Sequence, residues 1–329
     1  MELYEGLDQL PASSPYPVVT IGIFDGVHLG HQLIFRRVVE RAREVEGISV
    51  AVTFRPSPRQ VLNPDAPADL LTTFPQKCAL LEQMGLDAVL VIPFTRDFSR
   101  TPPEDFITNV LHLRVGAREI FVGHDFAFGR GRKGTIALLK DEARRLEIAV
   151  TVVGPVTAGG EPVSSSAIRE ALRSGDPQRA AELLGRPFSL AGSVVEGYRG
   201  GRELGFPTAN IRVGQEVLIP ADGVYAIRVL WRGTWYDGVA NVGTSPTFPG
   251  RPLRVEVHLF DVTATLYDEV LEVAFFARLR EERRFPSAEA LAEQIRQDVE
   301  QARALLAKLP PAGDREAAGH GPAAGGVSV

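Results

Sequence analysis

Residues 18–32, which read VVTIGIFDGVHLGHQ, decide the fold of this chain. Their first half is a continuous apolar run, which predicts a strand buried on both faces, and the pattern over residues 29–46 predicts a helix. His28 and His31 share the first turn of that helix, where unpaired backbone N–H groups point outward. A strand, a glycine turn, a helix N-terminus and two imidazoles together predict a phosphate-binding site. The residues alone leave a second interpretation open, two surface histidines near a helix start.

The turn resembles a motif of a known family. Residues 22–31 have the form G-x-F-D-G-x-H-x-G-H, which is similar to the motif of nucleotidyltransferases, in particular the bacterial FAD synthetases. The resemblance implies that His28 and His31 steady the transition state of adenylyl transfer from a nucleotide triphosphate. It also assigns nucleotide or phosphate contacts to Gly22, Phe24, Asp25 and Gly30.

Composition limits the class of protein. A length of 329 residues is long for one hydrophobic core, which predicts two domains. The net charge of −5 and the pI near 5.8 argue against a nucleic-acid partner and favour small substrates. No apolar run approaches the roughly 18 residues of a membrane span, and the single cysteine, Cys78, excludes an intrachain disulfide. We expect a cytoplasmic protein without a membrane partner, either a monomer or a weak homo-oligomer.

The chain up to residue 184 alternates strands and helices. Further strands are expected at residues 48–54, 88–93, 119–122 and 149–153, and the helices between them at 75–84, 103–111 and 136–145. This alternation predicts a Rossmann-like α/β domain with a parallel sheet, whose ligands lie beyond the carboxyl ends of the strands. Pro56 and Pro58 predict a loop after the second strand.

A glycine-rich basic loop follows the strand at 119–122. Residues 123–134, GHDFAFGRGRKG, place three cations among glycines, which either approach a polyphosphate closely or form a solvated loop. With the preceding valine, the segment resembles V-G-x-D/N-F-x-F-G-x-x-R-x-G of the same family. The resemblance implies that Asp125 contacts the nucleotide.

Three hydroxyls precede a helix expected over residues 168–184. From the residues alone, Ser164, Ser165 and Ser166 are best explained as helix N-caps, worth about 1 kcal/mol. The alternative is a second helix start aimed at phosphate, with Arg169 as counter-charge, which the resemblance to the family's I-S-S-T-x-[IL]-R segment implies. A helix end supplies at most about 2 kcal/mol per charge, while catalysis needs at least about 8. Several groups, together with Mg²⁺, must therefore act on the triphosphate.

The pattern of the sequence changes near residue 185. Short apolar runs follow one another without helices between them, which predicts an antiparallel six-stranded β-barrel. These runs lie at residues 189–195, 223–231, 234–241, 254–260 and 269–280, and a C-terminal helix is expected at 287–309. We therefore expect domains at 1–184 and 185–309, and disorder in the Gly-, Ala- and Pro-rich tail 310–329.

The opening of the second domain holds a candidate metal site. Within residues 201–211, GRELGFPTANI, Thr208 and Asn210 present oxygens two residues apart, which suits Mg²⁺ but also a simple barrel turn. The segment resembles the G-R-x-L-G-F-P-T-A-N motif of riboflavin kinases, in which Thr and Asn hold the magnesium of MgATP. The resemblance assigns ATP contacts to Gly197, Gly201, Arg202, Gly205 and Pro207.

A strand carboxylate is the candidate base. In residues 254–261, RVEVHLFD, alternation places Glu256 on one face of a strand. An isolated strand Glu is usually solvated, but the resemblance to the E-x-H-[IL] strand of riboflavin kinases implies that Glu256 takes the proton from the riboflavin 5′-hydroxyl. The resemblance also implies flavin contacts for Asn241, Arg280 and Phe285, while the charged segment around Arg280 is equally typical of a solvated surface.

The resemblance spans about residues 15–309 and implies a bifunctional enzyme. The barrel would phosphorylate riboflavin with MgATP to give FMN, and the first domain would transfer an adenylyl group from ATP to FMN, giving FAD and pyrophosphate. Two alternatives remain, a single-activity FMN adenylyltransferase with a flavin-binding barrel and a non-catalytic flavin or nucleotide sensor. Arg55 and Ser57, where the family often has an acidic residue and a His, keep the first alternative open. Ser245 in place of Arg and Asp268 in place of Gly leave details of the flavin pocket open.

Overall fold

The computed structural model describes residues 1–11, 15–66, 69–196, 205–243 and 254–310. By their contacts they divide into two compact units, one with Met1–Pro67 and Phe74–Val163, the other with Ala68–Thr73 and the chain from Ser164 onward. The functional boundary near residue 185 stays a prediction. Apart from its first residue, the tail predicted to be disordered lies outside the described residues. No helix in the described ranges is long and apolar enough to cross a membrane.

The first unit is built on a parallel sheet. Its six strands lie in the order β1-β4-β3-β2-β5-β6, and every neighbouring pair is parallel. The strands are β1 (Glu2–Glu5), β2 (Pro17–Ile21), β3 (Ile48–Arg55), β4 (Ala88–Pro93), β5 (Glu119–Gly123) and β6 (Ala149–Val153). Every residue of β2 is buried, as its unbroken apolar pattern predicts.

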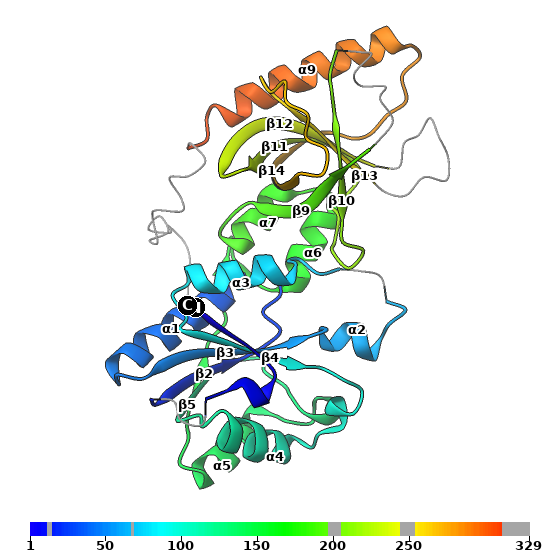
Figure 1. Cartoon of the computed structure of the whole chain (residues 1–329). Coiled ribbons are helices and arrows are strands. Elements are labelled where there is room, and N and C mark those ends of the chain that lie inside the picture. The colour runs from blue at the N-terminus through cyan, green and yellow to red at the C-terminus, as the bar shows by residue number, and fades with distance from the viewer. Residues whose placement is uncertain (12–14, 67–68, 197–204, 244–253, 311–329) are drawn as a thin grey trace. The chain divides into compact units, whose positions relative to one another are not determined.

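Helices cover both faces of this sheet (Figure 1). They are α1 (Leu29–Glu44), α2 (Pro58–Leu62), α3 (Phe74–Gln83), α4 (Pro103–Asp105), the π-helix η3 (Phe106–Arg114) and α5 (Ile136–Arg145). α1 and α3 pack on one face around Phe35 and Leu81, while η3 and α5 pack on the other around Leu111 and Leu139. The predicted Rossmann-like α/β domain is therefore confirmed.

Two short elements differ from the prediction. β1 is a four-residue edge strand, too short and too polar for a pattern to show it. The residue Pro58, predicted to lie in a loop, begins α2, because proline is accommodated at the first position of a helix. Ser57 caps this helix, accepting from the Gln60 backbone N–H while the Gln60 side chain accepts from the Ser57 N–H.

The strand order places a switch in connection direction beside residues 22–31, which we call the histidine turn. From β2 the chain builds β3, β4 and the β1 edge on one side, whereas β5 and β6 lie on the other side of β2. Helices that follow neighbouring strands in opposite directions leave a gap at the carboxyl ends of β2 and β5, where open α/β sheets bind ligands.

The second unit contains a closed antiparallel barrel, as predicted, in the order β10-β13-β12-β11-β14-β9. Its strands are β9 (Phe188–Val195), β10 (Ala209–Val213), β11 (Gly223–Trp231), β12 (Thr234–Gly243), β13 (Arg254–Leu259) and β14 (Val270–Arg280). The predicted C-terminal helix is α9 (Ala288–Leu306), capped by Ser287. It packs on the barrel through Ala302 and Leu306, against Ala226, Val239 and Phe260.

The single helix predicted over residues 168–184 is wrong. There are two helices, α6 (Ser165–Ser174) and α7 (Pro177–Leu184). Gly175 ends α6 with a φ of 78°, in the left-handed region that favours glycine, and Asp176 caps α7 by accepting from the Arg179 N–H at 2.8 Å. The apolar periodicity runs through both helices, so it did not reveal the break.

The segment Ala68–Thr73 is tied to the barrel unit by backbone hydrogen bonds. The N–H of Leu70 donates to the carbonyl of Glu216 at 3.0 Å, and the carbonyl of Leu70 accepts from Leu218 at 2.9 Å. Asp69, only 5% exposed, accepts through its carbonyl from Nε of Arg169 at 2.8 Å. A short piece of the N-terminal half of the sequence thus completes the second unit.

Candidate active sites

The histidine turn is organised around the start of α1. His28 is its N-cap, and Nδ1 of His28 accepts from the backbone N–H of His31 at 3.4 Å. A neutral ring that accepts at Nδ1 carries its proton on Nε2. The two imidazoles stack with centroids 3.6 Å apart, and a Cβ on Gly30 would come within 3.1 Å of Cε1 of His28. Glycine at this position therefore leaves room for the His28 ring.

His31 is held as a neutral imidazole. Burial lowers the pKa of His31 well below its ordinary value, and the nearby His28 and Lys77 lower it further. Its Nδ1 is buried and has no hydrogen-bond partner among the described residues. The edge of the imidazole contacts Phe24, with ring centroids 5.4 Å apart. A neutral histidine with an unsatisfied nitrogen is suited to a hydrogen bond with a ligand.

The backbone between β2 and α1 is strained. Phe24 and Val27 have φ values of 51° and 45°, a conformation that residues other than glycine rarely adopt. A Cβ on Gly22 would lie 2.7 Å from the Phe24 ring, so that ring occupies the space beside the glycine. Asp25 is 5% exposed and faces Lys77. Such strain at the end of a buried strand is typical of a functional turn.

The basic loop after β5 lies at the same edge of the sheet. Thr20 of β2 pairs with Phe121 of β5, so the ends of the two strands are neighbours. Asp125 is exposed in the turn that follows β5, and Phe128 and Gly134 close the loop through two backbone hydrogen bonds of 2.9 and 3.1 Å. The sheet thus places Asp125 at the same carboxyl edge as the histidine turn, and its contact with nucleotide stays a prediction.

The sequence did not reveal a chain of aromatic rings at this edge. Successive rings have centroids 5.2–6.3 Å apart, within the range of favourable aromatic contact. In contact order the rings belong to Phe54, Phe94, Phe98, Phe106, Phe128 and Phe126. Only the last two stood in a recognised motif, and no local pattern could join residues from so many elements.

The serine motif lies in the second unit. Ser164 caps α6 and accepts from the N–H of Ala167 at 3.2 Å, so the N-cap interpretation is confirmed for this residue. Ser165 and Ser166 follow in the first turn. Nε of Arg169 also lies 3.4 Å from the carboxylate of Asp69. A role of these residues toward phosphate stays a prediction.

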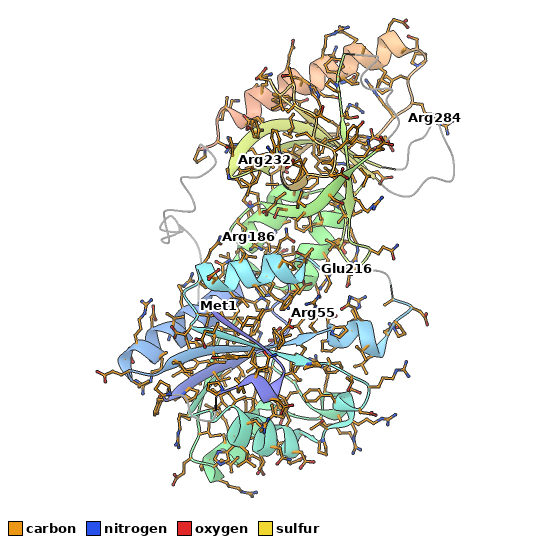
Figure 2. All side chains as sticks on the ribbon, in the orientation of Figure 1. Met1, Arg55, Arg186, Glu216, Arg232 and Arg284 are labelled. Atoms are coloured by element: carbon orange, nitrogen blue, oxygen red, sulfur yellow. The ribbon has the colours of Figure 1, made fainter. Side chains whose placement is uncertain are left out.

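The departures near β3 have structural partners. The guanidinium of Arg55, labelled in Figure 2, lies 4.6 Å from the centroid of the Phe74 ring, at cation–π distance. The hydroxyl of Ser57 accepts the N-cap hydrogen bond of α2. Neither Arg55 nor Ser57 therefore supplies, in this unit, the acidic group or the imidazole that the family often has at these positions.

Three candidate residues of the barrel form one row. Asn210 of β10 is the register partner of Glu256 on β13, and Glu256 is also the partner of Asn241 on β12. Directly opposed residues of antiparallel strands point to the same side of the sheet. Val255 and Val257, which alternate with Glu256, are fully buried, while Glu256 itself is half-buried. The row therefore lies on the outer face of the barrel.

The proposed metal ligands stand at one end of this row. Oδ1 of Asn210 is buried without a hydrogen-bond partner in the described residues, and Thr208 is exposed just before β10. Pro207 is anchored beside them, because its carbonyl accepts from Nδ1 of His258 at 2.9 Å. Gly205 lies on the exposed approach to β10, whereas Gly197, Gly201 and Arg202 lie outside the described residues.

The predicted flavin contacts lie at the other end. Val224 of β11 is the register partner of both Asn241 and Arg280. Arg280 donates from Nε and Nη2 to Asp298 of α9 at 2.8–3.0 Å, and its guanidinium lies 5.5 Å from the Phe285 centroid. Arg280 therefore joins the barrel to α9.

Glu282, which the sequence analysis did not single out, follows β14 and contacts this row at Asn241. It accepts from Nδ2 of Asn241 at 3.3 Å, and burial raises its pKa. A Cβ on Gly243 would come within 2.4 Å of its Oε2. No group of three His, Cys, Asp or Glu residues that could hold a metal exists in the described ranges, and the role of Thr208 and Asn210 as metal ligands stays a prediction.

A parallel α/β domain with a histidine turn, followed by a barrel with a carboxylate beside candidate magnesium ligands, defines a two-domain transferase of phosphorus-containing groups. Residues 11–167 match the FAD synthetase family, and residues 184–306 match the riboflavin kinase family. The chain belongs to the bifunctional riboflavin kinase/FMN adenylyltransferase family.

Relatives with that name cover nearly the whole chain. The protein of Haemophilus influenzae is 38% identical over 93% of this chain and 99% of its own length. That of Pseudomonas fluorescens is 40% identical over 93% and 98%. A solved structure from Streptococcus pneumoniae, described as a macrolide-efflux protein, has a TM-score of 0.83 and 31% identity over 92% of this chain and 99% of that one. The description concerns that protein, and no efflux activity is inferred from it.

Proposed function

We propose that the family's two activities, which convert riboflavin to FMN and FMN to FAD, are divided between the two sites described above. Adenylyl transfer belongs to the histidine turn. An FMN phosphate oxygen attacks the α-phosphorus of ATP, and pyrophosphate leaves. His28 and the neutral His31 donate hydrogen bonds to the phosphate oxygens, and Asp125 contacts the nucleotide. Positioning and charge stabilisation suffice, without a covalent enzyme intermediate.

The aromatic chain beside this turn offers a surface for the flavin ring of FMN. Half-buried rings such as Phe54 and Phe126 keep some exposed apolar surface that can contact a planar heterocycle. The strain at Phe24 and Val27 supports a functional turn, because such conformations cluster at functional sites.

Riboflavin phosphorylation belongs to the outer row of the barrel. Glu256 takes the proton from the 5′-hydroxyl, whose oxygen then attacks the γ-phosphorus of ATP, and ADP leaves. The orphaned Oδ1 of Asn210 and the exposed hydroxyl of Thr208 fit a hard cation, and these residues would hold Mg²⁺. When bound, Mg²⁺ neutralises charge on the phosphates of ATP. Gly205 and Pro207 line the approach for the nucleotide.

The register of Asn210 with Glu256 supports this assignment, because it sets the proposed metal ligand directly beside the proposed base. Chromatography of riboflavin incubated with MgATP tests it, and we expect FMN first and FAD later. FAD formed only from supplied FMN would indicate a single-activity adenylyltransferase, and no turnover would leave a sensor. We place both reactions in the cytoplasm, where the ATP pool is available.

A further inference from the structure

Lys77 of α3 is a buried cation that neither reaction step uses. Its Nζ donates to the carbonyl of Ile23 at 3.0 Å and to Oγ1 of Thr53 at 3.3 Å, and the residue is 8% exposed. Oγ1 of Thr53 donates to the same Ile23 carbonyl at 3.3 Å. Side chains from α3 and β3 therefore meet at one backbone oxygen of the histidine turn.

That oxygen immediately precedes the strained part of the turn. Phe24, the next residue, has a φ of 51°, and such a conformation persists only where the surroundings hold it. The far end of the turn is held by Nε2 of Gln32, which donates to the carbonyl of Val27 at 2.9 Å. The near end is held by Lys77, and a charged donor makes the stronger bond.

The charge of Lys77 also acts on His31. The groups that face Lys77 are Asp25 of the turn, Cys78 of its own helix and Arg55 at the end of β3. Around His31 the charged and titratable groups are His28 and Lys77, and both oppose its protonation. Burial is the largest cause of the lowered pKa of His31, and the positive charge of protonated Lys77 acts in the same direction, while burial also lowers the pKa of Lys77 itself.

We propose that Lys77 is a positioning residue of the adenylyl-transfer site, which fixes the Ile23 carbonyl ahead of the strained part of the turn and places a positive charge near His31. This inference rests on the proposed function of the histidine turn. It assigns to α3, more than forty residues away in sequence, a part in a motif that is otherwise local.

The test uses the full chain and three substitutions, Lys77→Met, Lys77→Gln and Lys77→Arg. The rate of FAD formation from FMN and ATP is measured against pH, and riboflavin kinase activity of the same sample reports folding. We expect Lys77→Met to lower kcat for FAD formation about tenfold or more, with kinase activity retained. Lys77→Gln keeps hydrogen-bond donors but lacks the positive charge. The fall in the rate of FAD formation at acid pH, the acid limb of its pH profile, should therefore begin at a higher pH in this variant, and Lys77→Arg should return it to the wild-type pH. Lys140→Met, at an exposed position of α5, is the matched control and should behave as the wild type.

An acid limb that does not move in either neutral variant would overturn the inference, even if stability falls, because Lys77 would then be only a structural anchor. If Lys77→Met does not fold, Lys77→Gln carries the same test. His31→Ala is measured alongside. FAD formation that survives His31→Ala would contradict the proposed function itself, whereas loss there with wild-type behaviour at Lys77 would contradict only this inference.

Discussion

Asn210 and Glu256 are register partners on neighbouring antiparallel strands, so a buried amide oxygen, which has no hydrogen-bond partner among the described residues, stands beside a half-buried carboxylate. Neither residue is explained by packing, since the barrel interior is filled by their alternating neighbours, such as Val255. A buried polar atom without a partner costs about 1–3 kcal/mol, which a ligand recovers. The pair is therefore the most specific sign of chemistry on the barrel.

Replacing the proposed base should separate the two activities. Glu256→Gln keeps the size of the side chain but removes the proton acceptor, so we expect FMN formation to fall about 10²–10⁴-fold. FAD formation from supplied FMN should persist, and His31→Ala should show the reverse pattern. Loss of both activities from either change, in a folded protein, would show that the proposed division between the units is wrong.

The metal ligand should reveal itself through the magnesium requirement. Asn210→Ala removes the orphaned oxygen, and we expect the Mg²⁺ concentration for half-maximal kinase activity to rise about tenfold or more. Asn109→Ala, at an exposed site of η3, serves as control. An unchanged magnesium dependence in Asn210→Ala would remove Asn210 from the ligand set.

Two glycines of the first unit provide a matched pair. Gly30→Ala places a methyl group 3.1 Å from Cε1 of His28 and should displace the imidazole, while Gly154 has open space around its Cβ position. We expect Gly30→Ala to slow FAD formation at least about tenfold and Gly154→Ala to leave it unchanged. Equal rates in the two variants would mean that the position of His28 does not matter for the reaction.

The ion pair between Arg280 and Asp298 should contribute to the stability of the barrel unit more than to flavin binding. Arg280→Met leaves a nearly buried carboxylate unpaired, and we expect the free energy of unfolding of the barrel unit to fall by about 3 kcal/mol. Adding Asp298→Leu should recover part of this loss. Arg296→Met, which removes an exposed pair on the same helix, should cost at most about 1 kcal/mol. Unchanged thermal melting of Arg280→Met with a raised KM for riboflavin would instead favour a direct flavin contact.

The neutral state of His31 makes stability depend on pH. Its pKa in the folded protein is lowered, while in the unfolded chain it is about 6.5, so below that pH the unfolded state binds more protons. The free energy of unfolding of the first unit should therefore fall as the pH is lowered from about 7.5 to about 5.5. Denaturant titrations of His31→Gln should show a smaller fall, and those of His124→Gln the wild-type one. An identical slope in His31→Gln would mean that His31 does not carry this dependence.

The sequence predicted what local patterns determine. The apolar run of β2 predicted a strand buried on both faces, and the alternation around Glu256 predicted that it lies on the face of β13 opposite to Val255 and Val257. Ser164 was readable as an N-cap because capping depends on only a few neighbouring residues.

Pairs that meet only in the folded chain were not predictable. Arg280 and Asp298 both lie in charged segments, and neither segment contains a pattern that predicts their contact. The same holds for Lys77 and the Ile23 carbonyl, because a backbone acceptor leaves no trace in the sequence. The break between α6 and α7 was in contrast predictable, because Gly175, Asp176 and Pro177 form a helix-ending glycine, an N-cap and a helix-starting proline, a signal that the continuous apolar periodicity masked.

The position of Ala68–Thr73 in the sequence limits how recombination can separate the two units. Because this segment precedes α3 in the chain but completes the barrel unit, no single crossover in the gene can hand the barrel unit intact to another protein without carrying residues 74–163 with it. Recombination near residue 164 would deprive the barrel unit of the backbone partners that Leu70 provides. The coding sequences of the two units are thus interleaved in one reading frame.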